Sequence, residues 1–522
     1  MVRSVPGTRE VPTTATVRAS STVRASTAPT PTWPVARGRE QVARPRVVVL
    51  GGGFAGLRLL RRLELLLPAD RAELIVVSPV DHLLYTSLVP QVCASTVEPR
   101  HLAVSLPAVL RRTLLCLGDA VAADLAAPAD AQTPAGGLAA PAGLAAPAAV
   151  AAPAATAANV GRRTVTVRAA DGSTRAIAWD RLVIAAGSVT ATPDVPGLAE
   201  HALGLKNLDE AVALRDHVLS RLELADATDD PRRRGALCTF VVVGGGYTGT
   251  ELAAQMAAFT RRAATAYRRL RPADVRWLLV DHSPRLLHDL APALGRRAAR
   301  VLSRRGIELR LGTSAVRIGP DSVTLAEGGS SVRRHTRVAT HTVVWCAGVR
   351  ASPLAAALGL PTEHGRIVTD EFFRVPSVED VFALGDIAAV PDSARGGAPA
   401  GQTAQHAVRQ GAAAARNVAA SLGVGTPRPY RHRDLGFVVD LGGRDAVANP
   451  FGVTLSGPPA ALLTRGYHLA SLPATANRLR VATDWLLNAA FGQEITHYVP
   501  SGTQQETIAT AEHTGIYRTP KS

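Results

Sequence analysis

Two runs of β-branched residues in this chain each end in three consecutive glycines, and apolar residues at helical spacing follow each of them. The runs are Arg46-Val-Val-Val-Leu50 and Phe240-Val-Val-Val243. A short apolar run bounded by glycines is typical of a buried parallel strand, and the pattern after it indicates a helix. The chain therefore contains the same strand, turn and helix unit twice.

The glycine spacing in the two turns has a physical reason. The first glycine lets the backbone bend sharply, the second lets a pyrophosphate approach where a Cβ would block it, and the third lets helix pack on strand. Free N–H groups at the helix start then meet the phosphate charge. A single such turn also occurs as a plain structural corner, but two of them predict two dinucleotides and hence electron transfer. The glycines are Gly51, Gly53 and Gly56 in the first turn and Gly244, Gly246 and Gly249 in the second.

Three further apolar runs predict buried strands. Residues 180–188 end in Gly187-Ser188, residues 275–281 end on Asp281, and residues 380–386 end in Gly385-Asp386. The Gly-Asp ending is also compatible with an ordinary type I turn. Strands that alternate with helical patterns predict an α/β fold.

Two segments have no apolar periodicity. Residues 1–44 are rich in Ser, Thr, Pro and Arg and predict a disordered tail. A targeting peptide is the less favoured interpretation, because the segment has neither an amphipathic helix pattern nor a continuous apolar stretch. Residues 126–159 are rich in Ala, Pro and Gly. Prolines at that density exclude a spanning helix, so this segment is expected to be an inserted flexible loop.

Composition adds a few limits. A length of 522 residues suits about three domains. The net charge of +16 suits an anionic membrane surface or nucleic acid, although the basic residues are nearly all Arg, which favours a coding bias. The four cysteines show no CxxC spacing, so a dithiol active site is not expected and the compartment is expected to be reducing. The histidines are scattered, and no metal site is expected.

The motifs together resemble a known superfamily. The two glycine turns, Ala185-Ala-Gly187, Cys346-Ala-Gly348 and Gly385-Asp386 follow one another as in the FAD-dependent pyridine nucleotide–disulfide oxidoreductases. The segments 77–91, 96–100 and 403–411 resemble the type II NADH:quinone dehydrogenases within that superfamily. The similarity covers about residues 45 to 495.

The resemblance implies a fold and a domain order. The fold is α/β, with two Rossmann-like dinucleotide-binding domains, the NAD(P)H domain being inserted into the FAD domain, and a C-terminal segment that associates with a membrane or dimerises. The expected order is a tail (1–44), the first part of the FAD domain (45–200, with the insertion 126–159), the NADH domain (201–342), the second part of the FAD domain (343–425), the C-terminal segment (426–498) and a tail (499–522).

The resemblance also implies the cofactor contacts. Ser78 stands where many relatives place an acidic residue for the adenosine ribose, so a hydroxyl would take that hydrogen bond. Asp281 would accept hydrogen bonds from the 2′-OH of NADH and repel the 2′-phosphate of NADPH, a preference that the nearby Arg285 could soften. For FAD the implied contacts are Gly51, Gly53, Phe54, Ala55, Gly56, Ser78, Ala186, Gly187, Gly385 and Asp386, with Ala404 beside the flavin. For NADH they are Gly244, Gly246, Tyr247, Gly249, Asp281 and Gly348.

Four residues are candidates for the chemistry. Glu251 follows the second glycine turn, where relatives carry Glu to position the nicotinamide or relay protons; the alternative is an acid that only stabilises the helix dipole. Lys206 is the only lysine besides Lys521, which suggests a site that needs a compact ammonium near the flavin, in a pair with Glu251, or else an ordinary surface lysine. Gln405 and Gln410 could bind quinone carbonyls.

One departure from the family concerns this last motif. Arg409 stands where the second motif position is usually Gln, which leaves ordinary helix polarity as an alternative for the two glutamines.

The C-terminal segment bears on location. Leu479, Trp485 and Leu486 belong to one helical face, and Asp484 and Asn488 belong to the other. Such a helix lies in a membrane interface, or packs on its own domain or in a homodimer. The protein is expected at the cytoplasmic side of the cell membrane as a peripheral protein, or in the cytoplasm.

The predicted function is an FAD-dependent NADH dehydrogenase that passes electrons to a membrane quinone without pumping protons. Alternatives are a sulfide:quinone oxidoreductase, which needs closely spaced reactive cysteines, and an NADH-dependent ferredoxin reductase. From another class, the chain could be a slow NADH-sensing flavoprotein that binds nucleic acid, although no nucleic-acid partner is expected.

Overall fold

The computed structural model describes residues 44–125, 163–328 and 334–496. The expected insertion at 126–159 and the expected tail at 499–522 lie outside the described residues, as does the N-terminal tail except for Arg44.

The first glycine turn leaves the centre of a five-stranded parallel sheet. Its strand order is β22-β9-β1-β2-β5, and every neighbouring pair is parallel. Val47, Val48 and Val49 of the central strand are fully buried, as the continuous apolar run predicts. The strands are β1 (Arg46–Leu50), β2 (Glu73–Ser78), β5 (Leu114–Leu117), β9 (Arg181–Ile184) and β22 (Val381–Ala383).

The second glycine turn leaves the centre of a second sheet with the same plan. The order is β11-β18-β12-β13-β14, again with parallel pairs throughout. Because β18 belongs to this sheet, the expected domain boundary after residue 342 cuts into a strand of the second sheet. The strands are β11 (Ala202–Leu203), β12 (Thr239–Val243), β13 (Arg276–Asp281), β14 (Ile307–Leu311) and β18 (Thr342–Trp345).

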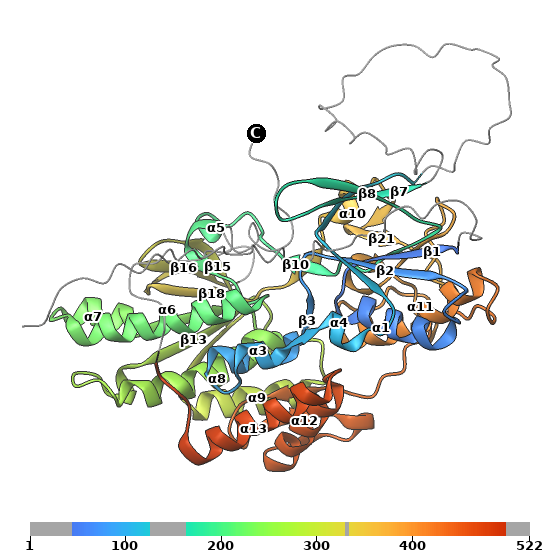
Figure 1. Ribbon diagram of the computed structural model, residues 1–522. Helices are drawn as coiled ribbons and strands as arrows, with labels where there is room; N and C mark the ends of the chain where they lie inside the picture. The colour runs from blue at the N-terminus through green and yellow to red at the C-terminus, as the bar shows by residue number, and fades with distance from the viewer. Residues whose placement is uncertain (1–43, 126–162, 329–333, 497–522) are drawn as a thin grey trace, which may run out of the picture. The chain divides into compact units, whose positions relative to one another are not determined.

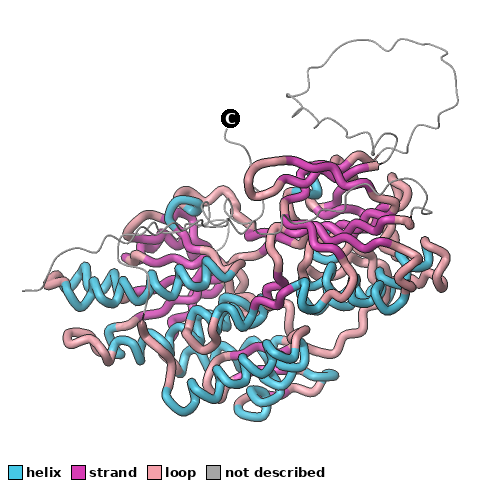
Figure 2. The backbone as a smooth tube through the Cα atoms, in the orientation of Figure 1, coloured by secondary structure: helices cyan, strands magenta, loops and turns pink. Residues whose placement is uncertain are grey.

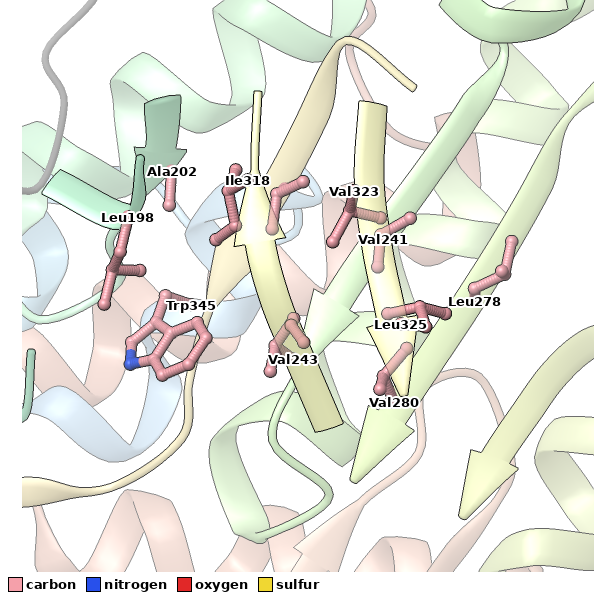
Figure 3. Close-up of a cluster of buried hydrophobic side chains, with 12 residues drawn as sticks. Leu198, Ala202, Val241, Val243, Leu278, Val280, Ile318, Val323, Leu325 and Trp345 are labelled. Atoms are coloured by element: carbon pink, nitrogen blue, oxygen red, sulfur yellow. The ribbon is translucent and has the colours of Figure 1, made fainter. Parts of the chain in front are cut away.

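Two antiparallel sheets complete the duplication. The sheet β6-β7-β8 is inserted between β5 and β9, and the sheet β15-β16-β17 is inserted between β14 and β18. The second of these packs on the parallel sheet through Val241, Val280, Val323, Leu325 and neighbouring side chains (Figure 3). The strands are β6 (Asp119–Ala123), β7 (Thr164–Arg168), β8 (Thr174–Ala178), β15 (Thr313–Ile318), β16 (Ser322–Glu327) and β17 (Arg334–Ala339).

Two short strands carry the chain between the parallel sheets. β10 (Ser188–Thr190) leads from the first sheet to the second, and β19 (Val349–Ala351) leads back. They pair antiparallel, with Ser188 opposite Ala351. The two halves are thus joined next to the segments that end in Gly187 and Gly348.

A long helix follows each glycine turn, as the helical spacing of apolar residues predicts. α1 packs along α11 so closely that a Cβ on Gly411 would lie 2.4 Å from the backbone oxygen of Ala55. The longer helices are α1 (Phe54–Leu66), α6 (Leu208–Ala227), α8 (Tyr247–Ala264), α9 (Pro292–Arg304) and α11 (Ala404–Ser421). Shorter ones are α2 (Val89–Cys93), α3 (Pro99–Leu102), α4 (Leu106–Val109), α5 (Leu198–His201), α7 (Pro231–Leu237) and α10 (Leu354–Ala357).

Short strand pairs accompany these elements. β3 (His82–Leu84) pairs with β4 (Ala103–Ser105), and a small sheet joins β20 (Thr362–Glu363), β21 (Arg366–Val368) and β23 (Ala388–Ala389). A third small sheet, near the C-terminal end, contains β24 (Val438–Asp440), β25 (Ala446–Ala448) and β26 (Leu455–Ser456).

The last two described helices are α12 (Pro458–Ser471) and α13 (Thr475–Phe491), which lie side by side (red in Figure 1, cyan in Figure 2). On α13 two polar side chains face the protein: Asp484 accepts a hydrogen bond from His101, and Asn488 donates to the backbone oxygen of Thr96. Leu486 and Phe491 are exposed. The helix is therefore amphipathic, but the apolar side chains divide between its two sides: those just named point outward, whereas Val481 is fully buried.

Candidate active site

The first glycine turn has the geometry that the spacing predicts. Gly51 adopts φ of 109°, and a Cβ there would lie 2.4 Å from the backbone oxygen of Ala185. A Cβ on Gly56 would lie 1.9 Å from the backbone oxygen of Gly51. A Cβ on Gly53, in contrast, would have no described atom within 4 Å. The outer glycines are thus required by packing, and the middle one borders open space.

The second turn repeats these contacts. Gly244 adopts φ of 116°, a Cβ there would lie 2.5 Å from the backbone oxygen of Cys346, and a Cβ on Gly249 would lie 1.9 Å from the oxygen of Gly244. Gly246 again borders open space.

Both turns fit a pyrophosphate. Helices α1 and α8 begin after Gly53 and Gly246, and within the described residues no side chain caps either start. Their first backbone N–H groups are therefore available to an anion at the positive end of the helix dipole. The residues present suit a dinucleotide at each turn.

Each glycine turn, with the helix start that follows it, forms a cradle for a phosphate group. The Gly-Asp turn, Gly385-Asp386, lies over the first cradle. Gly385 adopts φ of 78°, and a Cβ there would lie 3.2 Å from the Cβ of Ala55. Its backbone N–H donates to Oε1 of Gln410 at 2.6 Å, and Gln402 donates to the backbone oxygen of Asp386. The turn is thus held by two glutamines of the segment around the start of α11.

This arrangement changes the expected role of Gln410. The side chain is fully buried, and its amide oxygen is used by the backbone of Gly385. Gln410 therefore positions the Gly-Asp turn. This role differs from the expected one, a contact with quinone. Gln405 is half-buried and donates to the backbone oxygen of Gly436, next to Ala404, the first residue of α11. Arg409 donates to the backbone oxygen of Gln405 and so braces the same turn of helix.

Lys206 lies where the two halves meet. Its Nζ donates to Oγ of Ser188 at 3.0 Å, and Ser188 donates to Oδ2 of Asp386 at 2.7 Å. Burial lowers the pKa of Lys206, an effect that the charges of Asp386 and Glu210 oppose. Lys206 is therefore close to the predicted flavin contacts. The expected pair with Glu251 is not found: the acids whose charges act on Lys206 are Asp386 and Glu210, and Glu251 is bonded elsewhere.

Glu251 is instead bonded to the C-terminal part of the chain. Its Oε1 accepts the backbone N–H of Asp440 at 2.8 Å. Burial, together with the charge of Asp440, raises the pKa of Glu251 well above its usual value. A carboxyl kept neutral in this way can donate a hydrogen bond or a proton at neutral pH.

The two ribose candidates lie at equivalent strand ends. Ser78 is the last residue of β2 and is buried; a Cβ on Gly52 would lie 3.3 Å from its Oγ. Asp281 is the last residue of β13, and its carboxylate accepts the N–H groups of Ser283 and of Gly245 in the second turn. Both side chains therefore reach their glycine turn.

Other predicted cofactor residues fall in or beside the same cradles. Phe54 and Tyr247 are the first residues of α1 and α8. Ala186 and Gly187 follow β9, and Gly187 and Gly348 adopt φ of 69° and 99°. Arg285 donates to the backbone oxygen of His288.

The cysteines do not form a thiol site. Burial raises the pKa of Cys116 to about 11 and that of Cys346 to about 12, and it raises the pKa of Cys93 as well. Exposed thiols of low pKa, which the sulfide-oxidising alternative needs, are not found among the four. In the part of the chain that the structure describes, no group of three or more potential ligands could hold a metal ion.

Sequence reasoning missed three contributors. Ser188 directly follows Gly187, a predicted FAD contact, so its place in the sequence could have identified it as part of the site. Gln91 is the last residue of the segment 77–91 that carries the resemblance, but nothing marked its side chain. Asp440 ends a three-residue strand, and its place beside Glu251 depends on contacts far along the chain.

Comparisons with known proteins agree with this architecture. The chain is 29% identical over 466 residues to the type II NADH:quinone oxidoreductase Ndh of Mycobacterium tuberculosis, a match that covers 86% of this chain and 89% of the relative. It is 29% identical to the demethylphylloquinone reductase NdbB of Synechocystis, with 85% and 96% covered. The fold matches the solved structure of NDH2 from Plasmodium falciparum in complex with NADH, with a TM-score of 0.74 at 14% identity, over 87% of this chain and all of that one. A family model matches residues 45–411, well over half of the chain, so the chain belongs to the pyridine nucleotide-disulphide oxidoreductase family.

Proposed function

We propose that this chain is an FAD-dependent NADH:quinone oxidoreductase. The observation that carries the proposal is the pair of equivalent cradles, each with two packed glycines and one that borders open space. A protein that binds two dinucleotides side by side is suited to move electrons from one to the other. The printed names of the two relatives, an NADH:quinone oxidoreductase and a demethylphylloquinone reductase, support quinone as the acceptor.

The first cradle would hold FAD. Gly51, Gly53 and Gly56 would face its pyrophosphate. Asp386 would form a hydrogen bond with the ribityl or pyrophosphate portion of FAD. Ser78 would bind the adenosine ribose. When bound, flavin supplies the ability to take a hydride from a nicotinamide and to pass the electrons on.

The second cradle would hold NADH. Gly244, Gly246 and Gly249 would face the pyrophosphate, and Asp281 would bind the 2′-OH of the adenosine ribose. The carboxylate is fixed by Ser283 and Gly245, so it would present a negative charge that disfavours the 2′-phosphate of NADPH. Glu251, two residues after Gly249, would orient the nicotinamide or hold a proton.

The reaction balances with one proton taken up. NADH gives a hydride, quinone gains two electrons and two protons, and NAD⁺ and quinol are formed. The role of the protein would be to align the rings and exclude water, since well-placed reactants need little further help. None of the helices among the described residues is long and apolar enough to cross a membrane.

The quinone site is proposed at the start of α11. Ala404 and Gln405 are half-buried at the start of α11, the helix that packs against the Gly-Asp turn, and an amide can bind a quinone carbonyl. Gln410 would contribute indirectly, because its amide oxygen accepts the backbone N–H of Gly385 and so positions the Gly-Asp turn.

The outward face of α12 and α13 is proposed as the contact with an anionic lipid surface. A helix normally turns its apolar residues inward, and here several apolar side chains are exposed while Asp484 and Asn488 are bonded to the protein. Arg480 is exposed on the same helix and would favour anionic head groups. We place this surface at the cytoplasmic side of the cell membrane. The exposed apolar side chains are Leu462, Leu463, Tyr467, Leu479, Leu486, Leu487 and Phe491.

One assay tests the function. The purified protein should be yellow, and it should oxidise NADH with a soluble quinone analogue as the sole acceptor, at least about tenfold more efficiently than NADPH. A colourless protein that cannot take up flavin would refute the proposal. Turnover with ferredoxin but not quinone would favour the ferredoxin reductase, and salt-dependent DNA binding with negligible quinone turnover would favour the nucleic-acid-binding sensor.

A further inference from the structure

Glu251 faces a second buried acid that the family resemblance does not assign. Glu251 is 8% exposed and Asp440 is 7% exposed. Asp440 ends β24, and its backbone N–H donates to Oε1 of Glu251 at 2.8 Å although the two residues are 189 positions apart. The charge of Asp440 also acts on Glu251 and raises its pKa. Two interacting buried carboxyls cannot both be ionised at low cost, so one of them is expected to carry a proton.

The hydrogen bonds around Asp440 indicate which carboxyl is ionised. Trp485 has only a donor to offer, and its Nε1 donates to Oε1 of Gln91 at 2.7 Å. The amide nitrogen of Gln91 must then face Asp440, and it donates to Oδ2 at 2.7 Å. Gly442 donates its N–H to Oδ1 at 2.8 Å. Both oxygens of Asp440 are thus acceptors, which suits a carboxylate.

The charges nearby favour the same assignment. Burial raises the pKa of both carboxyls. At Asp440 the charges of Arg465 and Arg305 oppose the rise, as do the bonds from Gly442 and Gln91. At Glu251 only the backbone N–H of Asp440 opposes it, and the charge of Asp440 adds to it. The phenols of Tyr85 and Tyr247 also lie near Glu251, and burial raises their pKa values too.

We propose that Asp440 is a positioning residue for the proposed reaction: its backbone fixes the Glu251 carboxyl, and its carboxylate, oriented by Gln91, makes Glu251 the member of the pair that carries a proton. The inference rests on the proposed function, because NADH oxidation by quinone takes up one proton and a neutral Glu251 is a place to hold it. Trp485 ties this pair to α13, the helix with the exposed leucines.

Infrared spectroscopy of the flavin-loaded protein tests the assignment without turnover. At neutral pH we expect a protonated carboxyl C=O band that disappears in Glu251→Gln. In Asp440→Asn the band should titrate away at least about one pH unit lower, a tenfold loss of proton affinity. The pH profile of kcat should shift by the same amount, with the KM for NADH unchanged.

Two further variants separate the charge from the hydrogen bonds. The double variant Gln91→Glu with Asp440→Asn keeps the hydrogen bond from Trp485 to position 91 and the hydrogen bond between positions 91 and 440. It moves the negative charge from position 440 to position 91, away from Glu251. The titration midpoint of its carboxyl band should therefore lie between those of the wild type and Asp440→Asn. Asp445→Asn removes a nearby acid that is paired with Arg305 and should leave the midpoint unchanged.

Two results would overturn the inference. One is an equal titration midpoint in wild type and Asp440→Asn, and the other is a protonated band that survives in Glu251→Gln and is lost in Asp440→Asn. Absence of NADH:quinone turnover in the wild type would reject the proposed function instead, and it would leave the infrared result valid.

Discussion

The Nζ atom of Lys206 lies 3.0 Å from the Oγ atom of Ser188. Ser188 belongs to β10, the strand that leaves the first half of the protein, and Lys206 follows β11 of the second half. Since Ser188 also donates to Asp386, this contact connects the second half to the Gly-Asp turn. A compact ammonium fits this position, where burial already lowers the pKa of the lysine.

Replacing Lys206→Arg should slow flavin reduction by NADH about tenfold or more. The guanidinium is larger, and a buried site that fits an ammonium has to shift to admit it. Stopped-flow measurement of flavin absorbance gives the rate. Lys521→Arg makes the same change at the only other lysine, outside the described residues, and should leave the rate as it is. A rate in Lys206→Arg equal to that of the wild type would remove Lys206 from the site.

Gly53→Ala and Gly56→Ala should have different effects: the first should weaken FAD binding, and the second should lower stability. A methyl group at Gly53 meets no described atom, so the protein should fold normally but bind FAD at least about tenfold more weakly, because the group fills the pyrophosphate space. A methyl group at Gly56 would collide with the oxygen of Gly51, so Gly56→Ala should lower the thermal midpoint.

The second turn supplies the control for this pair. Gly246→Ala should retain its flavin and its stability while the KM for NADH rises. Flavin fluorescence, thermal unfolding and steady-state kinetics separate the three variants. A folded Gly53→Ala protein with full FAD affinity would show that the pyrophosphate binds elsewhere.

The turns were predictable because their causes are local. Gly56 packs on Gly51, five positions earlier, and the buried valines of β1 follow directly from the apolar run; only the contact of Gly51 with Ala185 joins distant parts of the chain. The duplication of the two sheets follows from two such units, and the strand-end position of Asp281 follows from the pattern of residues 275–281.

Other parts of the site depend on contacts that a local pattern cannot reveal. Gln410 was expected to face quinone, yet its oxygen bonds to Gly385, 25 positions earlier. Trp485 was expected on the apolar face of its helix, but it turns inward because Gln91, 394 positions away, offers an acceptor for the indole N–H. Helical spacing predicts two faces and leaves open which face meets the protein.

Asp281→Asn should reduce the preference for NADH. The substitution keeps the size of the side chain but removes the charge that would repel a 2′-phosphate, so the ratio of kcat/KM for NADH to that for NADPH should fall about tenfold or more. Asp289→Asn removes a charge from an exposed side chain eight positions later and should leave the ratio unchanged. If both variants keep the wild-type ratio, Asp281 does not face the ribose.

His468 should make the protein sensitive to acid. Burial lowers its pKa to about 4, and Tyr85 lies 3.1 Å from its Nδ1. The unfolded chain binds this proton more tightly than the folded one, so the stabilisation is complete above about pH 6.5 and is lost as the pH falls toward 4, by about 3 kcal/mol in total. Urea unfolding at several pH values measures the slope.

The variant His468→Asn keeps a polar side chain but cannot take up the proton. Its unfolding free energy should therefore fall less steeply than that of the wild type between pH 6.5 and 4, whatever its stability at neutral pH. His335→Asn alters an exposed histidine and should retain the wild-type slope. Equal slopes in all three proteins would show that folding does not lower the pKa of His468.

Leu486→Glu should weaken binding to anionic vesicles, because it places a charge on the outward apolar face of α13. Leu486 is 72% exposed, so the change costs the fold little, and membrane affinity is expected to fall about tenfold or more. Sedimentation with vesicles of phosphatidylglycerol and phosphatidylcholine measures the bound fraction. Leu65→Glu changes a leucine that is 76% exposed on α1 and should bind like the wild type. If Leu486→Glu binds vesicles normally but dissociates a dimer in light scattering, the outward face is a subunit interface, since the same exposed leucines would then be covered by a second copy of the chain.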